Sequence, residues 1–303
     1  MIDPEIHRPL LFSIAYRMLG RVVEAEDMVQ ETLLRWHRAG PAEIREPRAW
    51  LTTTVTRLCI DQLRLARRQR EEYVGVWLPE PLLEDRPHEA ELADSLGIAF
   101  LLMLEALDPV ERAVFLLREA FGHDYAAIAG IVGKSEAACR QIVSRAKARF
   151  GHEAAPEKTA TEEAERLVRE FVHATRTGEL AQLLRLLTDD AVLYSDGGGK
   201  VRAALLPIRG ADRIARMFIG LRRFQSDDPP PPRFVRINGS PGVLVRGGDG
   251  TLSAMTFALD HGRVKAVYVV RNPDKLIGVE GSTDGSQGPG CGIGIEPEND
   301  GMS

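Results

Sequence analysis

The chain has 303 residues, of which 44% are hydrophobic, and its formal net charge at pH 7 is -5. This length suits two or three domains with apolar cores. The chain contains no run of about 18 apolar residues, no signal-peptide pattern at its first residues and no metal-ligand spacing among Cys59, Cys139 and Cys291. We therefore expect a cytoplasmic protein without a membrane span, a metal or disulfides.

The net charge hides two basic segments. Residues 57–70 carry five Arg against one Asp, and residues 134–149 carry five basic residues against one Glu. Between these segments, residues 80–94 hold six acids and one Arg. Two basic patches on either side of an acidic connector are compatible with a nucleic-acid-binding protein, despite the negative average.

The sequence pattern predicts three helices in the first unit, residues 5–72. Pro9 and Gly20 bound the first helix, residues 23–39 form the second, and Pro47 opens a third that runs to residue 72. The threonine run at 52–54 would suit a strand, but the apolar spacing that follows is long and free of Gly and Pro, which favours a helix.

The second helix carries acids on one face. Asp27, Gln30 and Glu31 share that face, and we expect no cation at the adjacent i+4 positions. Such a face could meet a basic protein surface. The alternative is an ordinary solvated helix face.

The third helix separates an apolar face from a basic one. Arg57, Asp61, Arg64 and Arg68 follow one another at i+3 or i+4 steps, and Arg67 lies beside them. Guanidinium groups at this spacing can reach phosphates or base edges. The alternative is again a solvated face on a core helix.

Residues 73–96 form a Pro-rich acidic linker, and residues 97–150 form a second helical unit. Asp124 can cap a short helix, Gly133 supplies the tight turn, and Ser135 can cap the next helix. This pattern predicts a helix-turn-helix, although an ordinary helical hairpin shares the spacing. The predicted DNA-facing set is Ser135, Arg140, Gln141, Ser144, Arg145 and Lys147.

The third unit, residues 160–280, has an α+β pattern. We expect helices at 162–176 and 211–223 and strands at 234–237, 243–246, 252–259 and 264–270, separated by Gly- and Asn-rich turns. Residues 281–303 contain seven glycines and few bulky side chains, which predicts a disordered tail.

A basic helix, a linker and a helix-turn-helix together resemble regions 2 and 4 of an extracytoplasmic-function (ECF) sigma factor. The segments A-E-D-M-V-Q-E-T-L-L-R-W (25–36), P-R-A-W-L (47–51) and L-D-P-V-E-R-A-V-F-L-L-R-E (107–119) carry this resemblance. It implies that Asp27, Gln30 and Glu31 bind core RNA polymerase at the β′ clamp, with the β flap as a further contact. It also implies that the basic third helix opens and reads a −10 element and that the helix-turn-helix reads a −35 element of promoter DNA. Arg57 and Ile142 depart from this pattern, since many members carry Asn and Arg there.

Three further motifs are similar to those of sigma J-type ECF factors, which carry a fused C-terminal SnoaL-like domain. They are W-L-P-E-P-L (77–82), D-G-G-G-K (196–200) and N-P-D-K-L (272–276). This resemblance implies a cone-shaped, curved antiparallel sheet lined by helices, which tunes activity in cis and replaces a separate anti-sigma factor. The residues expected at this regulatory contact are Trp77, Leu78, Pro79, Glu80, Pro81, Asp196, Lys200, Asp274 and Lys275.

Relatives of the SnoaL-like fold include enzymes that use an Asp or His base, so a catalytic domain is a rival hypothesis. The candidate residues are His173, Asp196, Asp260 and Arg271, but they form no nucleophile–base series. The D-G-G-G-K motif lacks the spacing of a phosphate-binding loop. We therefore expect no catalysis and no cofactor. A second rival is a helix-turn-helix regulator that binds duplex DNA without polymerase.

Overall fold

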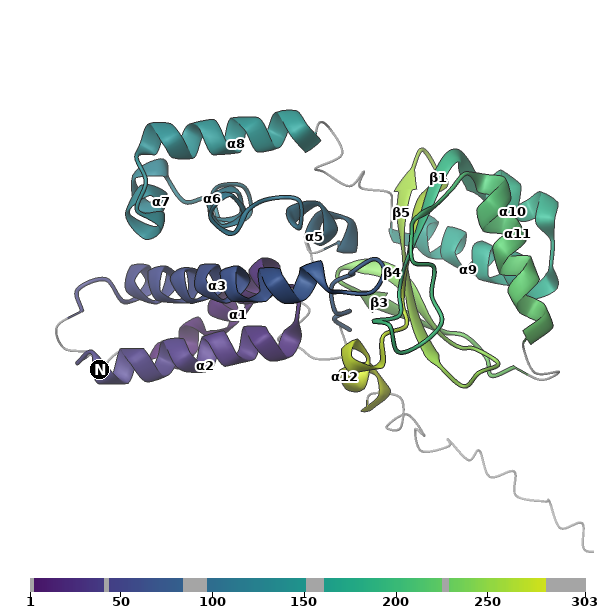
Figure 1. Cartoon of the computed structure of the whole chain (residues 1–303), viewed down its shortest axis with the longest axis horizontal. Coiled ribbons are helices and arrows are strands. Elements are labelled where there is room, and N and C mark those ends of the chain that lie inside the picture. Colours follow the sequence, from purple (N-terminus) through teal and green to yellow (C-terminus); the bar gives the residue numbers. More distant parts are fainter. Residues whose placement is uncertain (1–2, 41–43, 84–96, 151–160, 225–228, 282–303) are drawn as a thin grey trace, which may run out of the picture.

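The computed structural model describes residues 3–40, 44–83, 97–150, 161–224 and 229–281, without the side chains of residues 67–71 and 280. The helical half and the sheet-containing half lie side by side, with residues 73–83 passing between them (Figure 1). Residues 84–96 of the predicted linker and the predicted tail at 282–303 lie outside the described ranges.

The first unit consists of a short 3-10 helix (Pro4–His7) and three helices: α1 (Arg8–Leu19), α2 (Val22–Arg38) and α3 (Pro47–Glu71). α1 ends because Gly20 adopts φ +70°, a left-handed conformation that favours glycine. The threonines of α3 are accommodated because Thr53 and Thr54 donate to the carbonyls of Ala49 and Trp50, at 2.8 and 2.9 Å. The predicted helix at the threonine run is confirmed.

The second unit contains α5 (Ile98–Leu104), α6 (Pro109–Glu119), α7 (Tyr125–Val132) and α8 (Glu136–Phe150). Asp108 and Glu111 form a capping box at the start of α6. The local signals of the helix-turn-helix are confirmed. Asp124 accepts from the Ala127 amide, Gly133 has φ +69°, and Ser135 accepts from the Ala138 amide.

The two helical units share one apolar core in this arrangement. Leu101, Leu104 and Phe115 of the second unit pack in the same cluster as Met18 and Leu51 of the first. A separate small cluster around Ile128, Cys139 and Val143 holds the helix-turn-helix together. Residues 5–72 and 97–150, predicted as two domains, therefore pack together as one helical body.

The third unit combines α9 (Thr161–Thr177), α10 (Leu180–Leu186) and α11 (Ala211–Leu221) with a six-stranded sheet. The strands are β1 (Leu187–Asp196), β2 (Ile208–Arg209), β3 (Arg233–Ile237), β4 (Ser240–Arg246), β5 (Leu252–Asp260) and β6 (Arg263–Val270), in the order β2-β1-β6-β5-β4-β3. Short helices at Arg222–Phe224 and Pro273–Lys275 and α12 (Ile277–Gly281) complete the unit.

The sheet is mixed, which corrects the expectation of a purely antiparallel sheet. β1 pairs with β6 in parallel, whereas all the other neighbouring strands are antiparallel. The three consecutive pairings from β3 to β6 bring β6 back beside β1, and α11 provides part of the crossover between the two halves of the sheet. The sequence pattern had not predicted β1, β2 or α10.

Successive side chains of the strands point to opposite faces of the sheet, and different elements cover each face. α9, α10 and α11 cover one face, where Phe171, Phe218 and Phe257 pack edge to face with ring centroids 5.3 Å apart in each contacting pair. Leu78 and Leu83 of the linker and Ile98 of α5 pack in the cluster on the other face. The linker and the second helical unit thus lie against the face of the sheet opposite to α9, α10 and α11.

Candidate nucleic-acid, polymerase and interdomain sites

The outward face of α8 is exposed. Arg140, Gln141, Ser144, Arg145 and Lys147 all lie at the surface, as predicted, and Cys139, Ile142, Val143 and Ala146 are buried. Ile142 is only 5% exposed, so the position where many ECF members carry Arg faces the core here. The cations are paired locally: Arg140 with Glu136 at 2.6 Å, Arg145 with Glu111 at 3.4 Å and Lys147 with Glu119 at 2.8 Å. Exposed pairs of this kind are weak and can exchange for phosphates.

The predicted DNA face of α3 is differently arranged. Arg57 donates from Nε to the Ile131 carbonyl and from Nη2 to the Gly130 carbonyl, both at 2.9 Å. Its guanidinium is therefore engaged by α7 of the helix-turn-helix in this arrangement. Asp61 and Arg64 form an exposed pair at 3.1 Å, and the side chains of Arg67 and Arg68 lie outside the described residues.

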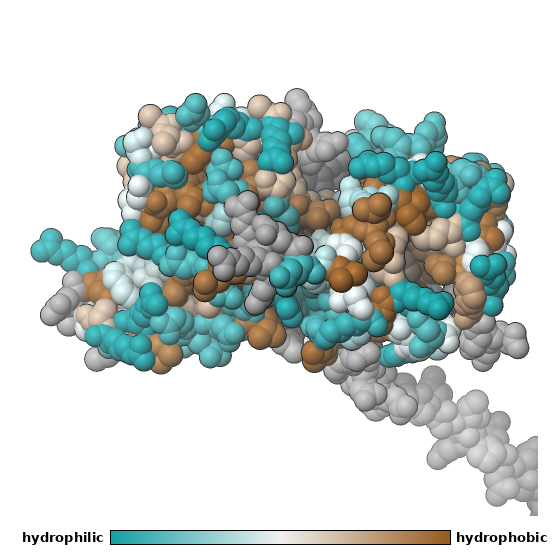
Figure 2. Space-filling model, in the orientation of Figure 1, coloured by the Kyte–Doolittle hydropathy of each residue, from teal (hydrophilic) through white to brown (hydrophobic). Residues whose placement is uncertain are grey.

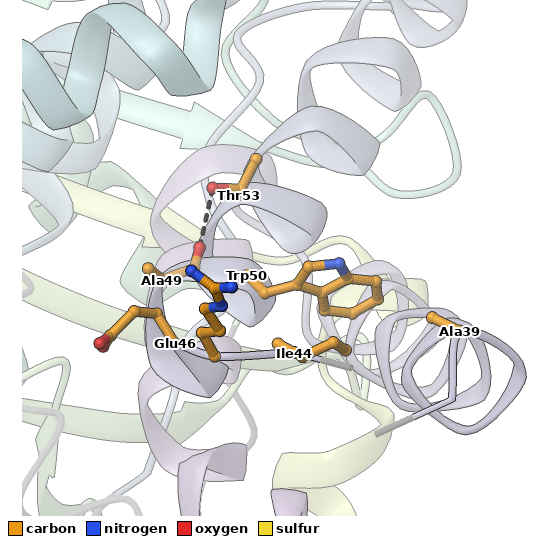
Figure 3. Close-up of a pocket in the computed structure, with 7 residues that line it drawn as sticks. Ala39, Ile44, Glu46, Ala49, Trp50 and Thr53 are labelled. Carbon is orange, nitrogen blue, oxygen red and sulfur yellow. Dashed lines mark hydrogen bonds between the residues drawn. The ribbon is translucent and has the colours of Figure 1, made fainter. Parts of the chain in front are cut away.

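An open surface hollow of about 520 Å³, called the cavity below, lies where α2 ends and α3 begins. It is lined by Ala39, Ile44, Arg45, Glu46, Ala49, Trp50 and Thr53. The Trp50 ring and Ile44 lie side by side and point toward Ala39 (Figure 3), and Trp50 meets the buried Trp36 edge to face at 5.7 Å. An aromatic face flanked by a guanidinium and a carboxylate can stack and hydrogen-bond a planar base. These residues were not predicted as site residues from the sequence, although Trp50 lies in the P-R-A-W-L segment.

The acidic face of α2 points to solvent, along an edge that is mainly hydrophilic (Figure 2). Asp27 and Gln30 are exposed, but Glu31 pairs with Arg35 at 2.7 Å. The expectation of no cation at i+4 is therefore wrong for Glu31. Leu34, which the sequence reading had passed over, is 50% exposed on the same face and follows Asp27 by seven residues.

The three motifs of the regulatory prediction meet around one buried carboxylate. Asp196, at the end of β1, accepts four hydrogen bonds: from the Tyr73 hydroxyl (2.6 Å), the Gly198 amide (3.0 Å), the Leu78 amide (2.8 Å) and Lys275 Nζ (2.7 Å). Asp196 and Lys275 are 0% and 1% exposed. A buried charge needs a partner and hydrogen bonds on every side, and this carboxylate has both.

Lys275 reaches from the sheet domain into the linker. Its ammonium donates to the Leu78 carbonyl at 2.5 Å and lies 4.2 Å from the Trp77 ring centroid and 5.1 Å from that of Tyr73. Burial, reinforced by the hydrogen bond to Asp196, raises the pKa of Tyr73, so its hydroxyl stays protonated and donates. We call Tyr73, Leu78, Asp196, Asn272 and Lys275 the linker contact.

Trp77 bridges the two halves. One atom of its ring lies 2.5 Å from the place where a Cβ at Gly20 would sit, so the ring packs directly on the end of α1. The same ring faces the Lys275 ammonium. Trp77 therefore contacts both α1 and the α+β unit. Leu78, Pro79, Glu80 and Pro81 are buried beside it.

The linker is fixed a second time beyond Trp77. The Glu80 amide donates to the Gly20 carbonyl at 2.9 Å, and the Glu80 carboxylate accepts from the Val22 amide at 3.1 Å. Burial raises the pKa of Glu80. Tyr16 donates to the Glu80 carbonyl at 2.5 Å and accepts from Asn238 Nδ2 at 2.8 Å. Tyr16 of α1 and Asn238 of the β3–β4 turn are thereby joined through one hydroxyl.

The D-G-G-G-K and N-P-D-K-L loops also contact each other. Lys200 pairs with Asp274 at the surface at 2.5 Å, and Asn272 donates to the Tyr73 hydroxyl at 2.9 Å. Gly198 has φ +60°, and a Cβ there would lie 2.3 Å from Asn272 Nδ2, so this position requires glycine. Tyr16, Tyr73, Asn238 and Asn272 had not been predicted as contact residues, because their partners are 64 to 222 residues away.

The four candidate catalytic residues do not come together. His173 is exposed near Glu179, Asp260 lies near Lys265 and His261, and Arg271 bonds to Asp249, Ser253 and the Arg202 carbonyl. Asp196 is occupied by the linker, and apolar side chains pack the helix-covered face of the sheet. Across the described ranges, no group of three or more His, Cys, Asp or Glu could hold a metal, and no helix is long and apolar enough to cross a membrane.

Comparisons with known proteins identify both helical units. Residues 5–69 match the model of Sigma-70 region 2, and residues 97–150 match that of Sigma-70 region 4. The chain is 35% identical over 294 residues to the ECF RNA polymerase sigma factor SigJ of Mycobacterium tuberculosis, covering 90% of this chain and 92% of that protein. It is 30% identical over 276 residues to the probable ECF sigma factor SigI of the same species, covering 89% and 92%.

The similarity extends to three dimensions. The crystal structure of Mycobacterium tuberculosis SigJ superposes with a TM-score of 0.75 at 32% identity and covers 90% of this chain and 97% of that one. Two helical sigma regions followed by a mixed-sheet unit are therefore the architecture of both the relative and this chain. The chain belongs to the extracytoplasmic-function RNA polymerase sigma factors.

Proposed function

We propose that the protein binds core RNA polymerase and directs transcription initiation from promoters with −10 and −35 elements, and that its α+β unit tunes this activity in cis. The observation that carries the proposal is the exposed polar face of α8, set on a helix-turn-helix in a chain of the sigma family. Arg and Gln on such a helix can make bidentate contacts to base edges, while Lys and Ser hold phosphates.

Polymerase binding is assigned to the exposed face of α2. Asp27, Gln30 and Glu31 offer polar groups, and Leu34 adds an apolar anchor beside them. This combination suits a basic clamp surface with an apolar pocket. Asp27→Arg/Glu31→Arg should weaken core binding and slow association most at low salt. Glu162→Arg/Glu163→Arg, a matched change at the exposed start of α9, should leave it unchanged. Equal core affinity in the two double variants would refute the assignment.

Recognition of the −10 element is assigned to α3 and the cavity beside Trp50. The cavity lies at the N-terminal end of α3, the helix that carries Arg57 and Arg64. If a base stacks on Trp50, the DNA strand that carries this base lies near these two cations. Arg45→Ala and Glu46→Gln alter exposed groups of the cavity and leave the Trp50–Trp36 contact in place. Both should slow promoter melting, measured by a fluorescent base analogue in the −10 element, without reducing binding to an isolated −35 duplex.

Regulation in cis is assigned to the linker contact. In the described arrangement Arg57 is bound by the helix-turn-helix, whereas a promoter requires regions 2 and 4 at the spacing of its two elements. The sheet holds the linker through Asp196 and Lys275 and packs against α5 through the cluster that contains Ile98. It therefore restrains both ends of the connection between regions 2 and 4. The fused α+β unit can therefore shift the balance between the described arrangement of regions 2 and 4 and one in which they are spaced for a promoter.

The test is reconstituted run-off transcription with core polymerase, comparing the full chain with Trp77→Ala and with a chain ending at residue 160. Both should change promoter affinity or output. If both match the full chain, the α+β unit is not a regulator, and the enzyme hypothesis gains weight. A reconstitution that contains only core polymerase, DNA and this chain also tests whether regulation occurs without a separate anti-sigma factor. We place this activity in the cytoplasm, where core polymerase acts.

A further inference from the structure

Three side chains from three helices stack beside the recognition helix. The Tyr125 ring, at the start of α7, has the Arg118 guanidinium of α6 4.8 Å from its centroid and the Arg140 guanidinium of α8 5.1 Å from it. Cations at this distance from an aromatic ring are attracted by its quadrupole. One ring thus connects all three helices of the helix-turn-helix unit.

Both guanidiniums are also held by oxygen atoms. Arg118 Nη1 donates to the His123 carbonyl at 3.0 Å, and Arg140 Nη2 donates to Glu136 Oε2 at 2.6 Å. These acceptors offset the repulsion between two cations that share one ring. Arg140 therefore has two different supports, a ring and a carboxylate, although 56% of its side chain remains exposed.

Arg145 differs from Arg140 in this respect. Its described polar contact is the 3.4 Å approach to Glu111, and 64% of its side chain is exposed. A long flexible side chain loses rotamer freedom when it binds a base, so a side chain already fixed near its bound geometry discriminates better. Of the two arginines on this face, Arg140 has more contacts that restrict its side chain before DNA binds.

We propose that Tyr125, supported by Arg118, is a positioning residue that sets the sequence preference of Arg140 in the −35 element. The inference rests on the proposed function and adds to it the residue that fixes the reader. Tyr125 also packs at the edge of the apolar cluster around Ile128 and Val143, so its apolar bulk and its aromatic ring must be separated experimentally.

Two substitutions of Tyr125 make this separation. Tyr125→Phe keeps both the bulk and the ring, and Tyr125→Leu keeps apolar bulk but removes the ring. Arg118→Gln provides a third variant that removes one cation of the stack without touching the apolar cluster. Each would be assembled as the full chain with core polymerase and assayed by transcription from a promoter library randomised in the −35 element.

The measured quantity is the preference at the base position where Arg140→Ala loses discrimination. Tyr125→Phe should keep the wild-type preference, and Tyr125→Leu should reduce it about two- to fivefold, the effect of one exposed cation–aromatic contact. Arg118→Gln should reduce it by a smaller factor. Preferences at the other −35 positions should stay unchanged in all three variants, which a general loss of folding would not allow.

Two results would overturn the inference. If Arg140→Ala relaxes the preference and Tyr125→Leu and Arg118→Gln do not, the positioning role is refuted and the proposed −35 reading stands. If Arg140→Ala itself changes no preference, the assignment of Arg140 as a reader fails, and the positioning role fails with it.

Discussion

Two contacts hold regions 2 and 4 and the α+β unit together, and they are built differently. We call the contact between the two helical units the helical interface. There Arg57 donates to two backbone carbonyls, and its side chain is exposed. Arg112 is buried and donates to the Met18 carbonyl, but its ion-pair partner Glu105 belongs to its own unit. The buried Arg17 of α1 also lies 4.8 Å from the Phe121 ring centroid of the second unit, and apolar side chains pack around these contacts. Water, phosphate or another protein surface can replace these polar bonds one at a time.

The linker contact has no such alternative. Asp196 and Lys275 are almost fully buried, and each depends on the other and on the Leu78 backbone. Removing the linker would break the bonds from Tyr73 and the Leu78 amide to Asp196 and the bond from Lys275 to the Leu78 carbonyl, and it would expose a buried ion pair to water. From this comparison we expect the helical interface to open more readily than the linker contact.

Lys275→Met should produce the largest effect, because it leaves the Asp196 carboxylate buried without its cation. Removing one partner of a buried pair costs about 3–5 kcal/mol. The measurement is the free energy of unfolding of the full chain in urea. Lys200→Met is the matched control, because the Lys200–Asp274 pair is exposed and should contribute no more than about 1 kcal/mol. Equal losses in the two variants would contradict the special role of the linker contact.

Gly20→Ala should come next, because it places a methyl group against Trp77 and also forces a left-handed residue. Gly133→Ala isolates the second cost, since Gly133 has φ +69° and nothing within 4 Å of its added Cβ. The left-handed conformation alone costs about 1–2 kcal/mol. Gly20→Ala should lower the free energy of unfolding by more than Gly133→Ala does. The extra loss should disappear when Trp77→Ala is also present. An extra loss that persists with Trp77→Ala would mean that Trp77 does not press on Gly20.

Arg57→Ala should loosen the helical interface by about 1–2 kcal/mol, since it removes two hydrogen bonds that are partly exposed. Hydrogen exchange of the amides around Gly130 and Ile131 should accelerate, while exchange at Leu78 in the linker contact should not. Arg64→Ala, whose described partner is the exposed Asp61, serves as the control and should change neither. Faster exchange at Leu78 in Arg57→Ala would show that the two contacts open together.

Glu80→Gln should have the smallest effect, seen in the pH dependence of stability. Burial raises the pKa of Glu80 in the folded state, so the folded chain binds this proton more tightly than the unfolded chain does. The wild type should therefore lose stability as pH rises from about 4.3, the ordinary pKa of Glu, through the raised pKa. Gln keeps an acceptor for the Val22 amide and does not titrate, so the variant should show a flatter curve over that range. Parallel curves would show that Glu80 does not titrate with a raised pKa.

Local signals explain why much of the helical half could be predicted. Gly20 at the end of α1, Asp124 and Ser135 as caps and Gly133 in the turn all act on backbone within a few residues. The apolar period of the helices also agrees with the observed burial of Val29, Trp36 and Cys139. β1 was missed because its polar Thr188-Asp189-Asp190 segment lacks a strand's alternating pattern.

The candidate sites also contain residues that could be predicted from the sequence and residues that could not. The exposed face of α8 follows from helical period alone, and the three motifs named most residues of the linker contact. The pairing of Glu31 with Arg35 was also readable from i+4 spacing, and the sequence reading overlooked it. By contrast, the bonds from Arg57 to Gly130 and Ile131 span 73 and 74 residues, and no periodic pattern carries such information.

The two sigma regions, their helix caps and their turns could be predicted from the amino-acid sequence alone. Which of their polar side chains already have partners depends on how distant elements pack together. Asp196 bonds to Leu78 across 118 residues, and Asn238 bonds to Tyr16 across 222. Short-range hydrogen bonds and apolar periodicity depend on neighbours in the chain. The partner of a buried charge depends on which faces of distant elements pack together.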